Sequence, residues 1–234
     1  MEISPDTWVL YEWRGLRLNA TIVFTWGVMA LLVLVSSAIT ARLSEGETVS
    51  RWQVMLEVVI TTIRDQIDEV GAADPARYLP FIGTLFLFIA MSNILTIVPG
   101  YRPPTGSLST TAALAICVLI AVPIFSISRR GWRGYLGSYL RPSPFMLPFN
   151  VIGEMSRTIA LAVRLYGNVM SGTVIAGILI SVAPFFFPIL MQLLGLLTGV
   201  IQAYIFAILA MVYIASASRS RPQADPAPPD TPDT

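Results

Sequence analysis

A single arginine interrupts an otherwise lipid-soluble stretch of this sequence. Arg164 lies within "IALAVRLYGNVMSG", residues 159–172, and apolar side chains stand on both sides of it. An unpaired guanidinium in hydrocarbon costs about 3 to about 10 kcal/mol or more, so ionisable residues at such positions indicate a functional site. The residue type therefore predicts an electrostatic role, in which a fixed positive charge meets a carboxylate. In the competing interpretation, Arg164 reaches a membrane interface or bonds to backbone carbonyls.

The chain itself offers Arg164 few acidic partners. Residues 75–224 contain one acidic side chain, Glu154, and this residue is three positions from Arg157. Side chains at that spacing can pair on one face of a helix. The predicted counter-ion of Arg164 is therefore a carboxylate on another subunit.

The composition places these charges in a membrane protein. Of 234 residues, 55% are hydrophobic and 12% are charged, and the mean hydropathy is +0.70. Soluble domains carry roughly 25% charged residues. The formal net charge of +1 gives no indication of a nucleic-acid partner, and we expect none. One cysteine and no histidine exclude a disulfide framework, a Cys or His metal site and a histidine proton relay, so no metal and no cofactor are expected.

Runs of about 20 apolar residues are long enough to cross the hydrocarbon core of a bilayer. Three such runs are predicted to be transmembrane helices, at 19–41, 79–98 and 108–128. Pro123 in the third run is expected to kink it. Two longer apolar segments lie between 145 and 217, separated by "APFFFP". Because each is longer than an upright span requires, they are predicted to form a long, strongly tilted hairpin.

Residues 50–71 show a different pattern. Apolar side chains recur at helical spacing, and charged side chains lie between them. This is typical of an amphipathic helix at the membrane surface or against a partner. The other open interpretation is a solvated connector that packs on its own protein. The predicted fold class is an all-α polytopic membrane protein with five membrane-inserted helices and one surface helix.

Arginine placement predicts the orientation of this fold. With the N-terminus outside, the inner segments hold ten arginines and the outer segments hold three. Positively charged loops favour the cytoplasmic side. The predicted organisation is an outside segment 1–18, a membrane domain 19–217 and a cytoplasmic tail 218–234. The tail is rich in proline and polar residues and is expected to be disordered.

The stretch around Arg164 also carries a family resemblance. "RLYGNVMSG" resembles the signature R-L-[FY]-G-N-x-x-[AS]-G of subunit a of F-type ATP synthases. "IQAYIFAILAMVYIASA", which includes Gln202, resembles the last helix of that family, and "MSNILTIVPGYRPPTGSLSTTAALA" resembles its second and third spans. The resemblance extends over residues 75–217. The sequence also resembles the alternate N-type ATPases, several of which are linked to sodium.

The resemblance implies a stator subunit of the membrane sector, in which the tilted hairpin faces a ring of c subunits. Each c subunit carries one carboxylate in mid-membrane, and the arginine matching Arg164 faces these carboxylates. Two half-channels would lead H+ or Na+ to and from the ring, so that ion movement turns it. The implied partners are the c-ring, the peripheral-stalk b subunits, the other ATP synthase subunits and the lipid bilayer of a bacterial inner membrane. The subunit alone would catalyse nothing.

The sequence departs from this family at two positions where many members carry an acidic residue. Thr173 and Gly195 stand there, and neither can relay a proton by titrating. Ion passage would then depend on hydroxyl and amide groups, which hold water or replace the hydration of a cation. Glu154 is expected either at the inner half-channel or in a pair with Arg157. The candidate ion-translocation residues are Arg164, Asn168, Gln202, Glu154, Ser171, Thr173, Asn93, Thr110 and Thr111.

A stand-alone secondary transporter or ion channel is the alternative function. Such a protein would need a complete substrate site within this chain, and the sequence shows few membrane carboxylates and no internal repeat. An enzyme is not expected, because no nucleophile and base pair is available to carry chemistry. Ion transport by the chain alone would favour the transporter.

Overall fold

The computed structural model describes residues 9–13, 16–41, 51–70, 75–98, 100–140, 145, 147–182 and 187–218. The predicted tail therefore lies outside the described residues from residue 219 onwards. The helices are α1 (Ala20–Thr40), α2 (Arg51–Glu69), α3 (Pro75–Ile94), α4 (Leu108–Leu140), α5 (Leu147–Val182) and α6 (Phe187–Ser218). Five of them, all except α2, are long and apolar enough to cross a membrane. The predicted all-α polytopic membrane fold is confirmed.

A short β-hairpin precedes α1 and was not predicted. Strands β1 (Val9–Trp13) and β2 (Leu16–Asn19) pair in antiparallel fashion, with Trp13 opposite Leu16. The second strand leads directly into the first residue of α1. Strands this short leave little period-2 signal beside a strongly apolar span, so hydropathy alone does not reveal them.

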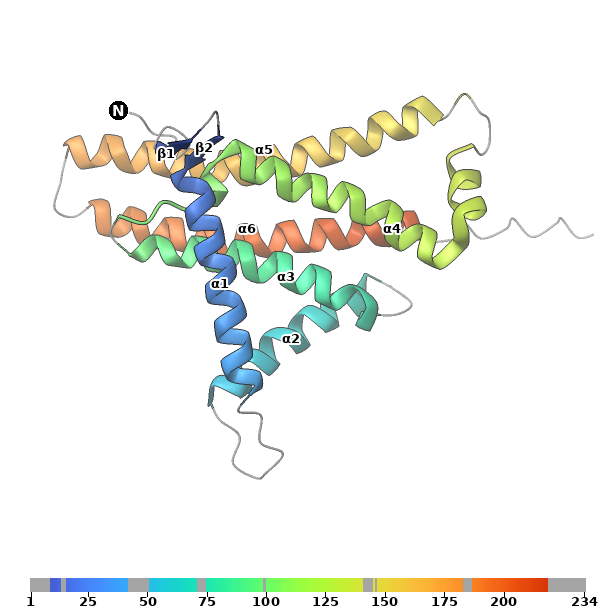
Figure 1. The fold of residues 1–234 in the computed structure, drawn as a ribbon, viewed down its shortest axis with the longest axis horizontal. Coiled ribbons are helices and arrows are strands. Elements are labelled where there is room, and N and C mark those ends of the chain that lie inside the picture. Colours follow the sequence, from blue (N-terminus) through green and yellow to red (C-terminus); the bar gives the residue numbers. More distant parts are fainter. Residues whose placement is uncertain are drawn as a thin grey trace, which may run out of the picture.

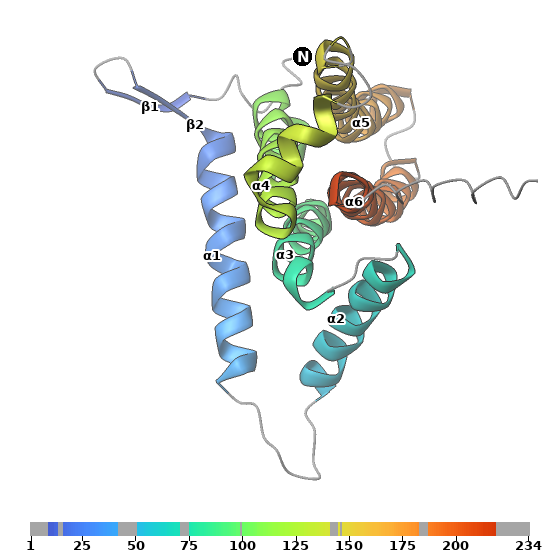
Figure 2. The same ribbon diagram turned by 90° about the vertical axis from the view of Figure 1, so that its right-hand side faces the viewer.

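Helices α3 to α6 form a bundle of neighbours that run alongside one another. Figure 2 shows these four helices nearly end-on, whereas α1 lies in the plane of the view on one side of the bundle. α2 packs below the bundle, against α3 and α6. In Figure 1, α5 and α6 lie side by side and cross the direction of α1 steeply. Relative to α1, the predicted long hairpin is therefore strongly inclined.

The core lies where α6 meets its neighbours. Small side chains on α6, among them Ala203 and Ala210, are fully buried and let the other helices approach closely. Ile89 of α3 and Leu165 of α5 are also fully buried, so the core joins all the long helices of the bundle. A hydrogen bond from Ser126 Oγ to the carbonyl oxygen of Ala217, 3.0 Å long, fixes α4 against the end of α6.

Helix α4 is broken at Gly131, just beyond the predicted third span. Pro123 lies within continuous helix, whereas Gly131 has φ 73° and ψ 164°, which divides α4 into two parts. Proline at an interior position is tolerated in membrane helices when neighbouring groups satisfy the freed carbonyl. A positive φ is readily adopted only by glycine, so Gly131 allows the sharp change of direction seen at the end of α4 in Figure 1.

Candidate functional site

Arg164 lies on the exposed flank of α5. In the same helical turn Leu161 and Leu165 are buried, so apolar contacts anchor this turn while Arg164 projects beyond their edge. Among the residues that the structure describes, none forms a hydrogen bond or an ion pair with Arg164. Glu154 lies ten residues earlier on α5, which is about 15 Å along the helix axis at 1.5 Å per residue. The guanidinium group is therefore open to a partner outside this chain.

One turn beyond Arg164, a polar contact joins α5 to α6. Asn168 Nδ2 donates a hydrogen bond to Gln202 Oε1 over 3.4 Å, a long contact. The Gln202 side chain is 4% exposed, and its Nε2 atom is buried without a hydrogen-bond partner in the described part of the chain. A buried donor that lacks a partner costs about 1–3 kcal/mol, so such a group is a natural place for a bound water or a passing ion. Gln202 thus offers a free amide N–H close to Arg164.

A second contact between α5 and α6 defines the register of the hairpin. The guanidinium carbon of Arg157 lies 5.9 Å from the centre of the Tyr213 ring, a cation–π arrangement. Asn168 and Arg157 are eleven residues apart on α5, and Gln202 and Tyr213 are also eleven apart on α6. Because the two helices run antiparallel with the same spacing between contacts, Arg164, four residues before Asn168, lies level with Phe206, four residues after Gln202.

A hydrogen-bonded clasp lies one turn before Gln202. Asn93 of α3 is 3% exposed; its Nδ2 donates to the carbonyl oxygen of Gly199 over 3.0 Å, and its Oδ1 accepts from Thr105 Oγ1 over 3.0 Å. A Cβ atom on Gly199 would lie 2.8 Å from the Asn93 Cβ, closer than packed atoms allow. Glycine at 199 therefore lets α6 approach α3 closely enough for the clasp to form.

The turn that supplies Thr105 is buried against the hairpin. This turn, η3 (Pro104–Gly106), is a short 3-10 helix whose three residues are buried. A Cβ atom on Gly106 would lie 3.3 Å from Val169 Cγ1, next to Asn168 on α5. η3 thus brings the Thr105 hydroxyl to Asn93 of α3 and lies against α5 at Val169.

Just before η3, an aromatic contact packs the chain against α1. Tyr101 meets Phe24 of α1 edge-on, with ring centres 5.1 Å apart. Burial raises the pKa of the Tyr101 phenol well above its ordinary value, because the low-dielectric surroundings disfavour the phenolate. Tyr101 therefore stays neutral over the physiological pH range.

A family model described as "ATP synthase A chain" matches residues 22–215, which include all of these contacts. The chain belongs to this family. It is 62% identical over 221 residues to "ATP synthase subunit a 2" of Acaryochloris marina, with 94% of each chain covered. It is 59% identical over 227 residues to "ATP synthase subunit a" of Albidiferax ferrireducens, covering 97% of this chain and 98% of the relative. It is 60% identical over 221 residues to "ATP synthase subunit a 1" of Chlorobaculum parvum, covering 94% and 98%.

In this chain, the candidate residues named from the sequence fall into two groups. Asn93, Asn168 and Gln202 lie together across α3, α5 and α6, with Arg164 one turn from Asn168. Thr111 is fully buried near the start of α4, where its hydroxyl donates to the carbonyl oxygen of Leu108 over 3.1 Å. Thr110, its neighbour, is partly buried.

The remaining candidates lie apart from this group. Ser171 and Thr173 are exposed on α5, and their hydroxyls donate to carbonyl oxygens of their own helix, over 3.2 Å and 2.6 Å. Such back-bonding is the ordinary behaviour of Ser and Thr in membrane helices. Glu154 lies near the start of α5, on the far side of Arg157 from Arg164.

Sequence reasoning missed two residues of the group. Thr105 was recognised only as part of a family motif, and Gly199 was not singled out. Neither residue carries a signal of its own, because a threonine in a loop and a glycine in an apolar run are common. Their role depends on the packing of η3 and α6 against Asn93, which only the fold reveals.

Proposed function

We propose that this chain is the stator subunit of a rotary ATP synthase that faces the c-ring and couples ion movement to ring rotation. It would supply two ion half-channels and a fixed positive charge between them. The observation that carries this proposal is the exposed guanidinium of Arg164, which has an amide pair beside it and no counter-charge in the described bundle. Membership of the ATP synthase A chain family supports the same function.

The ring is proposed to contact the face of α5 and α6 on which Arg164 lies. At 100° per residue, Ala160 and Ser171 share the flank of Arg164, and both are exposed. On α6, Leu197 and Ile201 are exposed on the side turned away from α3. Small side chains on α5 would let a ring helix approach closely. The surface therefore combines one charge with a smooth apolar contact area.

Arg164 would act on each ring carboxylate as it arrives. An adjacent positive charge favours the ionised form of a carboxyl group, so the bound proton or sodium ion is released. The same fixed charge repels cations that would otherwise pass directly between the half-channels. Arginine suits this role better than lysine, because it remains protonated and can bind a carboxylate with two hydrogen bonds.

The outer half-channel is proposed to reach the ring near Gln202. Asn93, Thr110 and Thr111 lie on the two helices that meet at η3, and the unpartnered amide of Gln202 lies one turn from the Asn93 clasp. Because the amide of Asn93 is held by Gly199 and Thr105, Thr110 and Gln202 are the polar groups better able to contact a passing ion or its water. The inner half-channel is proposed near Glu154, at the start of α5.

The topology remains part of the proposal. The N-terminus would lie outside and the C-terminus in the cytoplasm, in a bacterial inner membrane, with the b subunits and other ATP synthase subunits as partners. A stand-alone transporter or channel is the alternative. Purified chain reconstituted without the c-ring should show no ion flux, and flux under these conditions would favour the alternative.

Replacement of the arginine tests the proposal directly. Arg164→Ala should abolish ATP-driven ion pumping in inverted vesicles while the complex still assembles, and Arg164→Lys should be severely impaired because lysine binds carboxylates less well. The matched control is Ile159→Ala, since Ile159 is also exposed on α5 but on another side of the helix. Normal coupled pumping by assembled Arg164→Ala complex would show the proposal to be wrong.

A further inference from the structure

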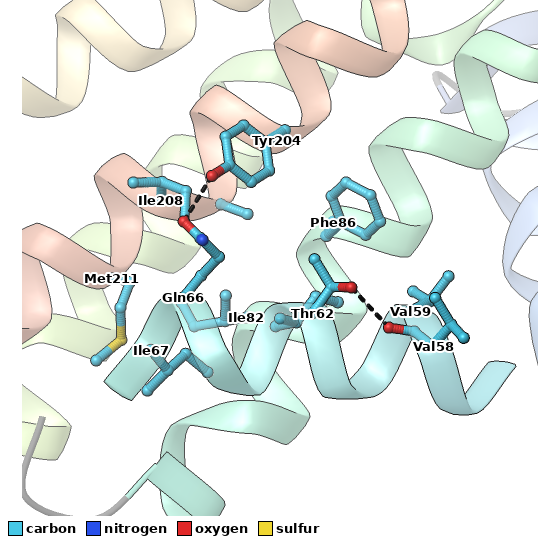
Figure 3. A pocket seen from close by; sticks show the side chains of 12 residues that line it. Val58, Val59, Thr62, Gln66, Ile67, Ile82, Phe86, Tyr204, Ile208 and Met211 are labelled. Carbon is cyan, nitrogen blue, oxygen red and sulfur yellow. Dashed lines mark hydrogen bonds between the residues drawn. The ribbon is translucent and has the colours of Figure 1, made fainter. Parts of the chain in front are cut away.

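A cavity lies between α2, α3 and α6, separate from the polar contacts around Gln202. It has a volume of about 140 Å³ and is partly open to the surroundings. Figure 3 shows the side chains that line it. Its wall is almost entirely apolar, and Val59, Ile63, Phe86, Ala207 and Met211 contribute to it. None of these residues has a part in the proposed ion path.

The size and chemistry of the cavity favour an apolar occupant. A cavity of about 150 Å³ lined by aliphatic and aromatic side chains stays dry and accepts apolar molecules such as benzene. An empty cavity leaves its wall without dispersion contacts on one side, so occupation by hydrocarbon is favourable. In a membrane protein, the apolar medium at the cavity mouth is the lipid acyl chains. Val54 and Val58 of α2 are apolar and exposed, which continues the apolar surface from the cavity towards the bilayer.

One end of the cavity is polar and acidic. Tyr204 Oη donates to Gln66 Oε1 over 2.6 Å, and Gln66 Nε2 donates to Glu69 Oε2 over 3.3 Å (Figure 3 shows the first contact). Asp65, which precedes Gln66, is exposed on the same part of α2. Two carboxylates therefore lie just beyond the apolar wall.

Two nearby arginines in the described part of the chain do not neutralise this end. At 100° per residue, Arg64 lies on the opposite side of α2 from Gln66. Arg77 of α3 is engaged with Ser128 of α4 through a hydrogen bond. The cavity thus combines a small apolar space with a negatively charged rim. The apolar space suits the hydrocarbon part of an amphiphile, and the rim suits a cationic headgroup.

We propose that this cavity binds one acyl chain of a bilayer phospholipid whose headgroup carries an ammonium group. The acyl chain lies along α2 between Gln66 and Val58, and the ammonium group lies beside Asp65 and Glu69. The proposal requires only that the protein lies in a bilayer, and it does not depend on the proposed ion path. The cavity wall on α6 includes residues 204–211. The lipid therefore packs behind the part of α6 that is level with Arg164.

Photolabelling of the assembled complex tests the acyl-chain site. The complex is placed in nanodiscs of phosphatidylethanolamine and phosphatidylglycerol, with a trace of phosphatidylethanolamine that carries a diazirine in its acyl chain. Label should appear on peptides that contain residues 58–67 and 204–211. Val58→Trp, at the cavity mouth, should lower this labelling about tenfold by excluding a few methylene groups. Val33→Trp on the exposed side of α1 should leave it unchanged.

Charge variants test the headgroup. The unmodified complex should be labelled more strongly by the phosphatidylethanolamine probe than by a matched phosphatidylglycerol probe. Asp65→Asn with Glu69→Gln should remove this preference, whereas Asp68→Asn, a carboxylate on another side of α2, should keep it. The purified complex must show normal subunit content for each variant.

Three results would overturn the proposal. The first is absence of label on both peptides in the unmodified complex. The second is equal labelling of the Val58→Trp variant, which would mean that the probe reacts with the outer surface. The third is a crosslink from a photoreactive amino acid at position 58 to another polypeptide, which would mean that a protein partner covers the cavity.

Discussion

Asn93, Thr105, Asn168 and Gln202 form a polar cluster between α3, η3, α5 and α6. Within it, Gln202 is the side chain whose hydrogen bonds are least satisfied. Its Oε1 atom accepts a long bond from Asn168, and its Nε2 atom is buried without a partner in the described part of the chain. If Gln202 had only a structural role, replacement by leucine would change little, because the unpaired donor would disappear and only the long bond from Asn168 would be lost. A structural role therefore predicts unchanged pumping after Gln202→Leu, whereas a role in ion transport predicts slower pumping.

Replacing this amide should slow transport without harming assembly. We expect Gln202→Leu, and likewise Thr110→Leu, to lower the rate of ATP-driven pumping about tenfold, which corresponds to the loss of one hydrogen bond to the passing ion or its water. Gln192→Leu is the control, since Gln192 lies on the same helix and its Nε2 donates to the carbonyl oxygen of Thr96. Unchanged pumping by Gln202→Leu, with equal subunit content, would assign Gln202 a structural role.

Gly199 gives a second prediction at this scale. Gly199→Ala should destabilise the complex by about 1–3 kcal/mol, because a Cβ atom would press on Asn93 and the helices would have to separate. Gly195→Ala, one turn earlier on α6, meets nothing within 4 Å and should have little effect. The stability of both variants can be measured by heating the purified complex and recording the temperature at which this subunit is released. Equal stability of the two variants would mean that the close contact relaxes without cost.

Individual residues were predictable from the sequence to different degrees. Arg164 was named as a candidate because a permanent charge within an apolar run is visible without any fold. The clasp of Thr105, Asn93 and Gly199 was not, because it joins segments 12 and 106 residues apart and depends on the helix register. Ser171 and Thr173 were named for their hydroxyl groups, and the structure reveals that these groups bond to their own helix.

At the scale of the elements, the register of α5 on α6 determines which residues reach the proposed ring surface. Ala160 and Ser171 lie on the flank of Arg164, whereas Ile152 and Ile159 are exposed on another side of α5. After Cys117 is replaced, Ala160→Cys and Ser171→Cys should form disulfide crosslinks with cysteines on the outer helix of the c-ring. Ile152→Cys and Ile159→Cys should not. If only Ile152→Cys and Ile159→Cys formed crosslinks, the ring would lie on the other side of α5 from Arg164, and the proposed ring surface would be wrong.

The membrane spans and the amphipathic type of α2 followed from hydropathy and periodicity, but the β-hairpin and the break in α4 did not. The five long apolar segments and the amphipathic α2 were predicted because periodicity and length are local properties of the chain. The break in α4 occurs at Gly131 and not at Pro123. A glycine breaks a helix only where the surrounding fold demands a positive φ, so its sequence context gives no warning. The steep crossing of α1 with α5 and α6 is likewise set by packing between distant segments.

At the scale of the whole molecule, the proposed function implies that this chain and the c-ring together would determine the coupling ion. The polar cluster consists of amides and hydroxyls, and Thr173 and Gly195 supply no titratable group. Such oxygen-rich surroundings are compatible with sodium. We expect low-millimolar sodium to stimulate ATP hydrolysis by the purified complex at fixed pH and to protect subunit c from carbodiimide. Absence of any sodium response at alkaline pH would instead support protons as the coupling ion.

The two contacts between α5 and α6 also have a mechanical consequence. Asn168 with Gln202 lies on one side of Arg164, and Arg157 with Tyr213 lies on the other. A turning ring would pull on Arg164 sideways, and a single attachment would let α5 pivot under that load. With an attachment on each side, the load is divided between two points of α6, which the clasp at Gly199 and the bond from Ser126 to Ala217 hold against α3 and α4. The arginine proposed to meet the ring is thus supported on both sides, like a beam held at both ends, and α3, α4, α5 and α6 together supply its stiffness.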